Sequence, residues 1–230
     1  MNFTGISSDA LFLLSRNRHE NSKQFYDAHK DQIKQQVFEP LQQLIEALSN
    51  DFATLDPHMQ LNPAKMMSRV RRDTRFTKEK HMYRDDVWAM FMRPKGADYP
   101  FVFPCMWFEV KPGQGRFSCG VCTYDQTPKF MQFLRERIDN DFLAAANQAI
   151  KAGAHFECES YKKDRAAQAP EQLKPYLNAK SFMFKYWCED LSLLESDAII
   201  THLRGKYKAC HAMYLWLQRA AEEYISLSIQ

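Results

Sequence analysis

The sixteen residues from 69 to 84 carry a high concentration of positive charge. They contain seven basic residues and two acidic ones, Asp73 and Glu79, so this stretch has a net charge of +5. Because the whole chain has a formal net charge of +3, the rest of the chain sums to −2. A local field attracts anions more effectively than the same charge spread over a surface. We call residues 69–84 the basic segment.

The residue types in the basic segment indicate an anion-binding site. The planar guanidinium of arginine matches phosphate and carboxylate groups, and lysine adds a point charge. Asp73 is placed to hold Arg72 or Arg75 in a bidentate pair that orients the guanidinium. Phe76 and Tyr83 are expected to anchor the loop by packing. The predicted ligand-binding residues are Arg69, Arg72, Asp73, Arg75, Lys80, Tyr83 and Arg84.

The spacing of these residues is long and uncommon. From Arg69 to Arg84 it resembles the pattern R-x-x-R-D-x-R-F-x-x-x-K-x-x-Y-K of the family named domain of unknown function 2461. Weaker similarity covers most of the chain, including residues 14–18 and 117–120. Arg18, Gln24 and Arg84 stand where the family pattern has Asn, Trp and Lys. The resemblance implies a common fold and supplies no activity.

Three functions are compatible with the basic segment. The first, which we favour, is binding of a small anionic or phosphorylated ligand, with its processing left open. The second is nucleic-acid binding or processing, in which Phe76, Tyr83 and Trp88 add aromatic surface. The domain pI of about 8.4 disfavours this, because a strongly basic nucleic-acid face usually raises the pI above about 9. In the third, the cluster is a fold-stabilising ion-pair network in a structural or partner-binding protein.

The cysteines suggest a weaker alternative. Cys119 and Cys122 have zinc-like spacing, and His155 and Cys158 would supply two further ligands. However, positions 119 and 122 point to opposite faces of a regular strand. We therefore expect buried structural thiols, no metal and no cofactor. No Ser-His-Asp or paired-carboxylate site can be assembled, so whether the chain is an enzyme stays open.

Composition restricts the protein class. Hydrophobic residues make up 45% and charged residues 26% of the 230 residues, which are globular values. The chain shows no export signal and no apolar stretch near the roughly 20 residues that span a bilayer. Six cysteines then fit reduced thiols, so we expect a cytoplasmic protein with no membrane association. The oligomeric state is not predicted.

The order of periodicities indicates one α+β domain over residues 1–230. Helical spacing covers both chain ends, with helices expected at 8–15, from residue 21 or 22, after Pro40, from Thr127 to about Lys151, at 170–179 and from residue 196 or 197 onward. Between them lie short aromatic runs. An antiparallel or mixed sheet is expected from residues of about 65–124, with 155–162 and 181–188, packed by the N- and C-terminal helices.

Overall fold

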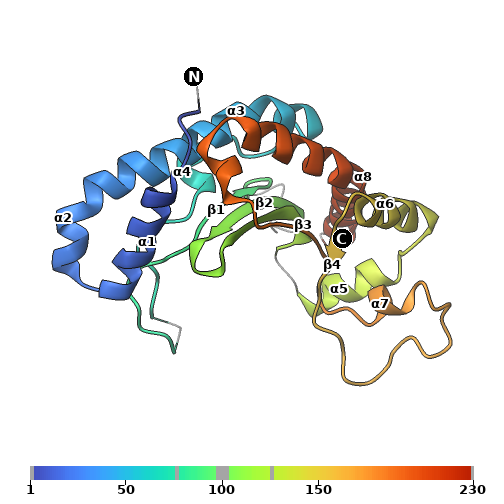
Figure 1. Ribbon diagram of the computed structural model, residues 1–230. Coiled ribbons are helices and arrows are strands. Elements are labelled where there is room, and N and C mark those ends of the chain that lie inside the picture. Colours follow the sequence, from blue (N-terminus) through green and yellow to red (C-terminus); the bar gives the residue numbers. More distant parts are fainter. Residues whose placement is uncertain (1–2, 76–77, 97–103, 125–126, 229–230) are drawn as a thin grey trace. The chain divides into compact units, whose positions relative to one another are not determined.

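A computed structural model describes residues 3–75, 78–96, 104–124 and 127–228, so Phe76 lies outside the described residues. The elements in chain order are α1 (Ser8–Glu20), α2 (Lys23–Ile33), α3 (Glu39–Leu55), α4 (Pro63–Met66), β1 (Val87–Phe91), β2 (Pro104–Lys111), β3 (Arg116–Thr123), α5 (Pro128–Arg135), α6 (Asn140–Lys151), β4 (His155–Phe156), α7 (Lys174–Leu177), β5 (Met183–Cys188) and α8 (Ala198–Ser228) (Figure 1).

The chain divides into two compact units. Unit 1 contains residues 1–91, 108–119 and 187–205, and unit 2 contains residues 92–107, 120–186 and 206–230. That both units belong to one domain stays a prediction.

The five strands form one antiparallel sheet in the order β1-β2-β3-β5-β4, which confirms the α+β class. The strands are shorter than the sequence predicts. The described part of residues 65–86 forms isolated bridges but no strand, and the run expected at 155–162 is reduced to two residues. The run expected at 181–188 begins at Met183.

Unit 1 begins with two capped helices. The Ser7 side chain accepts a hydrogen bond from the Ala10 amide at the start of α1, and Ser22 caps α2 in the predicted way. The helix expected at 8–15 is longer than predicted, because α1 continues to Glu20. The helix ends at Asn21, whose φ of +45° is the left-handed cap conformation that asparagine tolerates.

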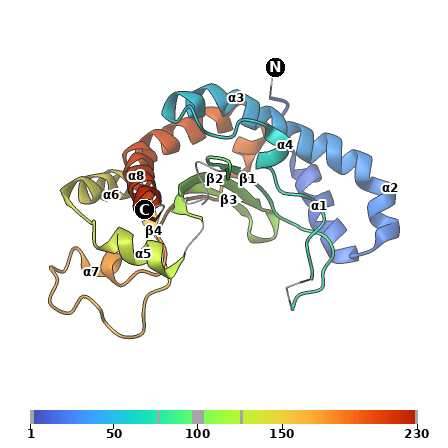
Figure 2. The same ribbon diagram turned by 180° about the vertical axis from the view of Figure 1, so that it is seen from behind.

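The restart at Pro40 is confirmed, and the interruption before it is a five-residue π-helical segment, Lys34–Phe38. Pro40 lies in the first turn of α3, where its missing amide hydrogen is not needed. The core of unit 1 includes Phe52 stacked on Phe91, with ring centroids 3.9 Å apart. The start of α8 runs beside α3 in both views (Figures 1 and 2), and Arg204 pairs there with Asp51 at 2.8 Å.

Unit 2 has two helices where the sequence predicts one from Thr127 to Lys151. Thr127 caps α5 as expected, but Asp139 starts a new helix by accepting a hydrogen bond from the Phe142 amide at 2.8 Å. Phe142 is fully buried, and its ring lies 4.8 Å from the Trp216 ring. In this way the second helix positions the aromatic core of the unit.

The helices of the described ranges include α8, which has 31 residues. None of these helices combines the length and the apolar character that crossing a bilayer requires.

Gly120 provides a test of the sheet. A Cβ atom at this position would lie 2.0 Å from the Phe184 carbonyl oxygen on the neighbouring strand, so Gly120→Ala should destabilise the protein by about 2 kcal/mol or more. Gly205→Ala is the matched control, because a Cβ there meets nothing within 4 Å and alanine favours the helix by about 0.5–1 kcal/mol. Urea unfolding measures both. Equal stability of Gly120→Ala and wild type would contradict the strand pairing.

Candidate functional site

The basic segment folds as a short antiparallel ribbon in unit 1. Arg71 lies opposite Tyr83. The Arg72 amide donates to the Met82 carbonyl oxygen at 2.8 Å, and the Arg84 amide donates to that of Val70 at 2.9 Å. Arg71 and Tyr83 therefore form a non-hydrogen-bonded pair, in which side chains approach most closely.

A bulge prevents this ribbon from becoming a regular strand. Met67 lies opposite Ala89 in a second bridge. The outgoing arm advances four residues from Met67 to Arg71, whereas the return arm advances six from Tyr83 to Ala89. The return arm therefore holds two extra residues, and such an insertion disrupts the ladder. The sheet was expected to begin at about residue 65, but its first strand begins at Val87, and the residues before it pair only locally.

The return arm is anchored to the N-terminal helices. The Asn21 side chain accepts a hydrogen bond from the Met82 amide at 2.7 Å. The Tyr83 ring stacks on Tyr26 at 4.9 Å, and Tyr83 is only 3% exposed. Burial raises the pKa of Tyr83. The structure therefore places Tyr83 in packing, as an anchor of the ribbon.

Glu79 pairs with two arginines from distant parts of the sequence. Its carboxylate contacts Arg72 at 2.6 Å and also contacts Arg18 of α1. The hydrogen bond from Arg72 and the nearby charge of Arg18 lower the pKa of Glu79. Arg18 also pairs with Asp85 in the bulge, at 3.4 Å. We call this group the Glu79 network.

The Glu79 network lines a depression of about 440 Å³ whose charges nearly balance. It has four basic and three acidic side chains. The lining residues are Arg18, Arg72, Glu79, Arg84, Asp85, Asp86, Lys111, Gly113 and Gln114. The near balance of charge indicates a structural role for these ion pairs.

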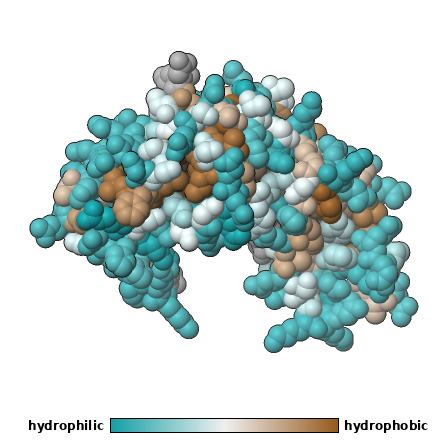
Figure 3. Space-filling view, in the orientation of Figure 1, coloured by the Kyte–Doolittle hydropathy of each residue, from teal (hydrophilic) through white to brown (hydrophobic). Residues whose placement is uncertain are grey.

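A second and larger depression of about 790 Å³ lies along the ribbon, and its charges do not balance. It has six basic side chains and one acidic side chain, and we call it the arginine depression. The lining residues are Ala64, Lys65, Met67, Arg69, Arg71, Arg72, Asp73, Thr74, Arg75, Arg84 and Trp88. Figure 3 shows the hydrophilic surface of the ribbon.

The arginine depression contains five of the seven predicted ligand-binding residues. These are Arg69, Arg72, Asp73, Arg75 and Arg84. Tyr83 and Lys80 do not line it, and the Lys80 ammonium donates to the Thr74 carbonyl oxygen at 3.1 Å. The structure therefore brings most of the predicted set together.

The predicted carboxylate–guanidinium pair forms between Asp73 and Arg75. The Arg75 Nε lies 3.0 Å from Oδ1 of Asp73, and Nη2 lies 2.7 Å from Oδ2. The hydrogen bonds from Arg75 lower the pKa of Asp73 to about 2. Asp73 is therefore charged at neutral pH and orients one guanidinium at the rim.

Arg69 and Arg71 differ from the other arginines of the depression. Both are exposed, and within the described ranges neither has a carboxylate within ion-pair distance. Arg72, Arg75 and Arg84 each pair with a carboxylate, the last with Asp86 at 3.6 Å. These two guanidinium groups are therefore available to a ligand, as is Lys65 of the same depression, which has no carboxylate within ion-pair distance among the described residues.

Sequence reasoning missed the importance of Arg18 and Asn17. Arg18 is noted there only as a departure from the family pattern, yet it completes the Glu79 network. Asn17 is fully buried, and neither polar atom of its side chain has a partner among the described residues. The weak N-terminal part of the family pattern was the available signal for both residues.

The structure does not gather the cysteines into a metal site. Cys122 lies beside Cys105, with their sulfur atoms 3.3 Å apart, and both are buried free thiols. The hydrogen bond with Cys122, together with burial, raises the pKa of Cys105. In the part of the chain that the structure covers, no cluster of three or more potential metal ligands occurs.

The comparison with family models decides the relationship. Residues 9–216 match the model described as conserved hypothetical protein (DUF2461). The chain belongs to the DUF2461 family. The match covers the ribbon and both units, so the DUF2461 resemblance of the basic segment extends over most of the chain. No curated protein and no solved structure matches the chain.

The Asp73–Arg75 pair predicts an acid-shifted titration. The Asp73 carboxyl should titrate near pH 2 in the folded protein. Its pKa should rise toward the usual 3.8 in Arg75→Gln, which removes the guanidinium but keeps the backbone hydrogen bond from residue 75 at 3.1 Å. Because the folded pKa is the lower one, any stability from this pair is present above about pH 4 and is lost as the pH falls toward 2. Carboxyl-detected NMR measures this pKa. An unchanged Asp73 pKa in Arg75→Gln would contradict the assignment.

Proposed function

We propose that the arginine depression binds a small anionic ligand, and that phosphate is the group it recognises. The observation that carries this proposal is the exposed, unpaired state of Arg69 and Arg71 beside three paired arginines. Paired arginines are oriented by their carboxylates, whereas unpaired ones retain all their hydrogen-bond donors for a ligand. Arginine presents these donors in a fork that matches phosphate oxygens.

The charge distribution supports the same proposal. Like charges in one depression repel one another, and a bound anion offsets that repulsion. The depression contains one carboxylate, Asp73, for six cations. Its volume of about 790 Å³ lies within the range of about 300–1,000 Å³ common for small-molecule sites. The smaller depression, which the Glu79 network lines, lacks this excess of positive charge.

The structural alternative accounts for one part of the basic segment. Arg72 and Arg84 form ion pairs that hold the ribbon to its neighbours, which is what a fold-stabilising network does. Arg69 and Arg71 have no such role in the described ranges. We therefore divide the segment into a structural part and a ligand-binding part. Binding in the cytosol is part of the proposal, and a catalytic step is not.

Anion-dependent stability tests the proposal. Saturating sodium phosphate or pyrophosphate, at about 100 times its dissociation constant, should stabilise the wild type by about 2.7 kcal/mol. The variant Arg69→Gln/Arg71→Gln should remain folded, because it breaks no ion pair in the described ranges, and should lose this response. Thermal unfolding with and without each anion measures the shift.

The matched control is Lys151→Gln/Lys208→Gln, which removes the same charge from exposed helical positions. It should retain the wild-type response. If Arg69→Gln/Arg71→Gln also retains that response, the anion site lies elsewhere. If the wild type responds to no anion, the basic segment is structural and the proposal is wrong.

A further inference from the structure

We propose that the arginine depression recognises a nucleotide unit, with its base against Trp88 and its phosphates on Arg69 and Arg71. This inference rests on the proposed anion binding and names the ligand class. The depression is lined by an aromatic side chain as well as by cations, because Trp88 and Met67 belong to its wall. Inorganic phosphate alone would leave this apolar part of the wall unused.

Trp88 is held in a fixed place on strand β1. Residues 87, 89 and 91 of the strand are buried, whereas Trp88 lies on the alternate, half-exposed face. The Trp88 amide donates to Oγ of Ser68 at 3.2 Å, and the Trp88 carbonyl oxygen accepts from the Ser68 amide at 2.9 Å. Since Ser68 is itself buried, these two hydrogen bonds hold the backbone of Trp88 in place in the wall of the depression.

The Trp88 ring has no stacking or cation partner within the ranges that the structure describes. Other aromatic side chains of unit 1 do have such partners: Tyr83 stacks on Tyr26, and Arg116 lies 3.7 Å above the ring of Trp187. Nucleobases stack on aromatic side chains regardless of sequence, because every base has a π-face. A base stacked on Trp88 would therefore supply the stacking partner that this ring lacks within the described ranges.

The charge of the depression favours more than one phosphate. A phosphate monoester carries about −1.5 to −2 at neutral pH. Three cations of the depression, Lys65, Arg69 and Arg71, have no carboxylate within ion-pair distance among the described residues, so one monoester would leave positive charge uncompensated. Arg69 and Arg71 are two separate unpaired guanidinium groups, and each can bind a phosphate through two hydrogen bonds. A nucleoside diphosphate, or successive nucleotides of a single strand, has this combination of base and phosphates.

Calorimetric titration with pyrophosphate and with ADP tests the inference. Base stacking of about 1–3 kcal/mol corresponds to about 5- to 150-fold in affinity, so ADP should bind the wild type at least about fivefold more tightly than pyrophosphate. Trp88→Leu should bind both with the pyrophosphate affinity. Arg69→Gln/Arg71→Gln should lose both ligands.

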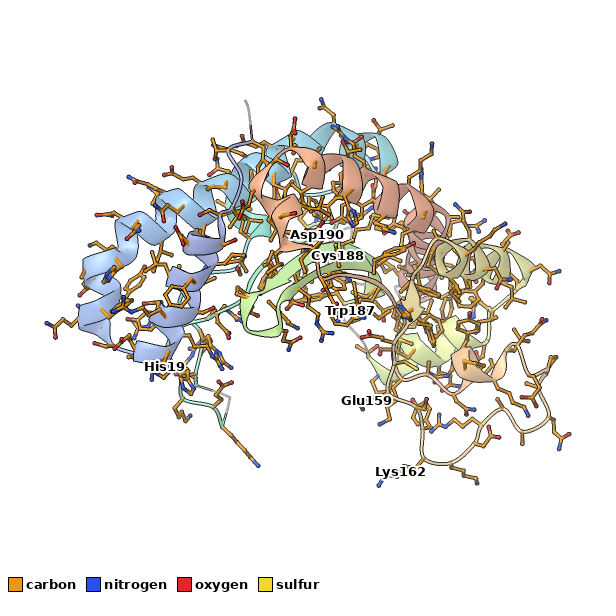
Figure 4. All side chains as sticks on the ribbon, viewed as in Figure 1. His19, Glu159, Lys162, Trp187, Cys188 and Asp190 are labelled. Atoms are coloured by element: carbon orange, nitrogen blue, oxygen red, sulfur yellow. The ribbon has the colours of Figure 1, made fainter. Side chains whose placement is uncertain are left out.

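The matched control is Trp187→Leu, a tryptophan of the same unit at the end of β5, which Figure 4 labels and which does not line the depression. It should keep the preference for ADP. If the wild type binds pyrophosphate and ADP equally, the nucleotide inference is wrong while the anion site stands. If neither ligand binds, the proposed function itself is wrong.

A thymidine oligonucleotide series distinguishes the two sources of a nucleotide unit. Affinity that rises with oligonucleotide length and depends on Trp88 assigns the unit to a single strand. Affinity that is highest for ADP assigns it to a free nucleotide. Oligonucleotide binding that survives in both Trp88→Leu and Arg69→Gln/Arg71→Gln would overturn the assignment to this depression.

Discussion

The fold of the basic segment depends on the contacts of Glu79. This one carboxylate lies between Arg72 of the ribbon and Arg18 of α1, and Asp85 supplies a second counter-charge to Arg18. The pair also connects the ribbon to an N-terminal helix that precedes it by about fifty residues. Arg72 is 18% exposed at its side chain, which makes its counter-charge important for the folded state.

The position of Glu79 also explains why the two depressions differ. Glu79 of the segment and Asp85 and Asp86 of its bulge line the smaller depression. The arginine depression is lined by one carboxylate, Asp73. Within the described ranges, Arg69 and Arg71 therefore remain the arginines of the segment that pair with no carboxylate. This uneven distribution of acidic residues leaves the arginine depression, the proposed binding site, with an excess of positive charge.

Much of the fold could be predicted from local sequence. Ser22, Pro40 and Thr127 were recognised as helix starts because capping is a short-range interaction. The errors arise where a single residue decides whether a helix continues or ends. Asn17 remains helical because it is buried against the core, and Asp139 divides a predicted helix because it caps the next one. Apolar periodicity contains neither outcome, because the first involves tertiary burial and the second is a short-range cap within an otherwise periodic stretch.

The candidate site was predictable to a similar extent. Asp73 and Arg75 are two positions apart in the sequence, so their pairing is a local contact and was predicted. The contact of Glu79 with Arg18 was not, because no periodicity relates positions 61 residues apart. The two-residue bulge was also missed, so the ribbon was expected to be a strand. Trp88 was noted as aromatic surface, but its place in the depression depends on that bulge.

NMR of the arginine Nε–Hε groups during a pyrophosphate titration tests the central claim most directly, because it observes each guanidinium separately. The account predicts that the Arg69 and Arg71 signals shift with saturation, while the Arg18 signal, which belongs to the Glu79 network, stays in place. Shifts of Arg18 equal to those of Arg69 and Arg71 would contradict the division of the basic segment into structural and ligand-binding parts. An absence of shifts at Arg69 and Arg71 would contradict the anion site.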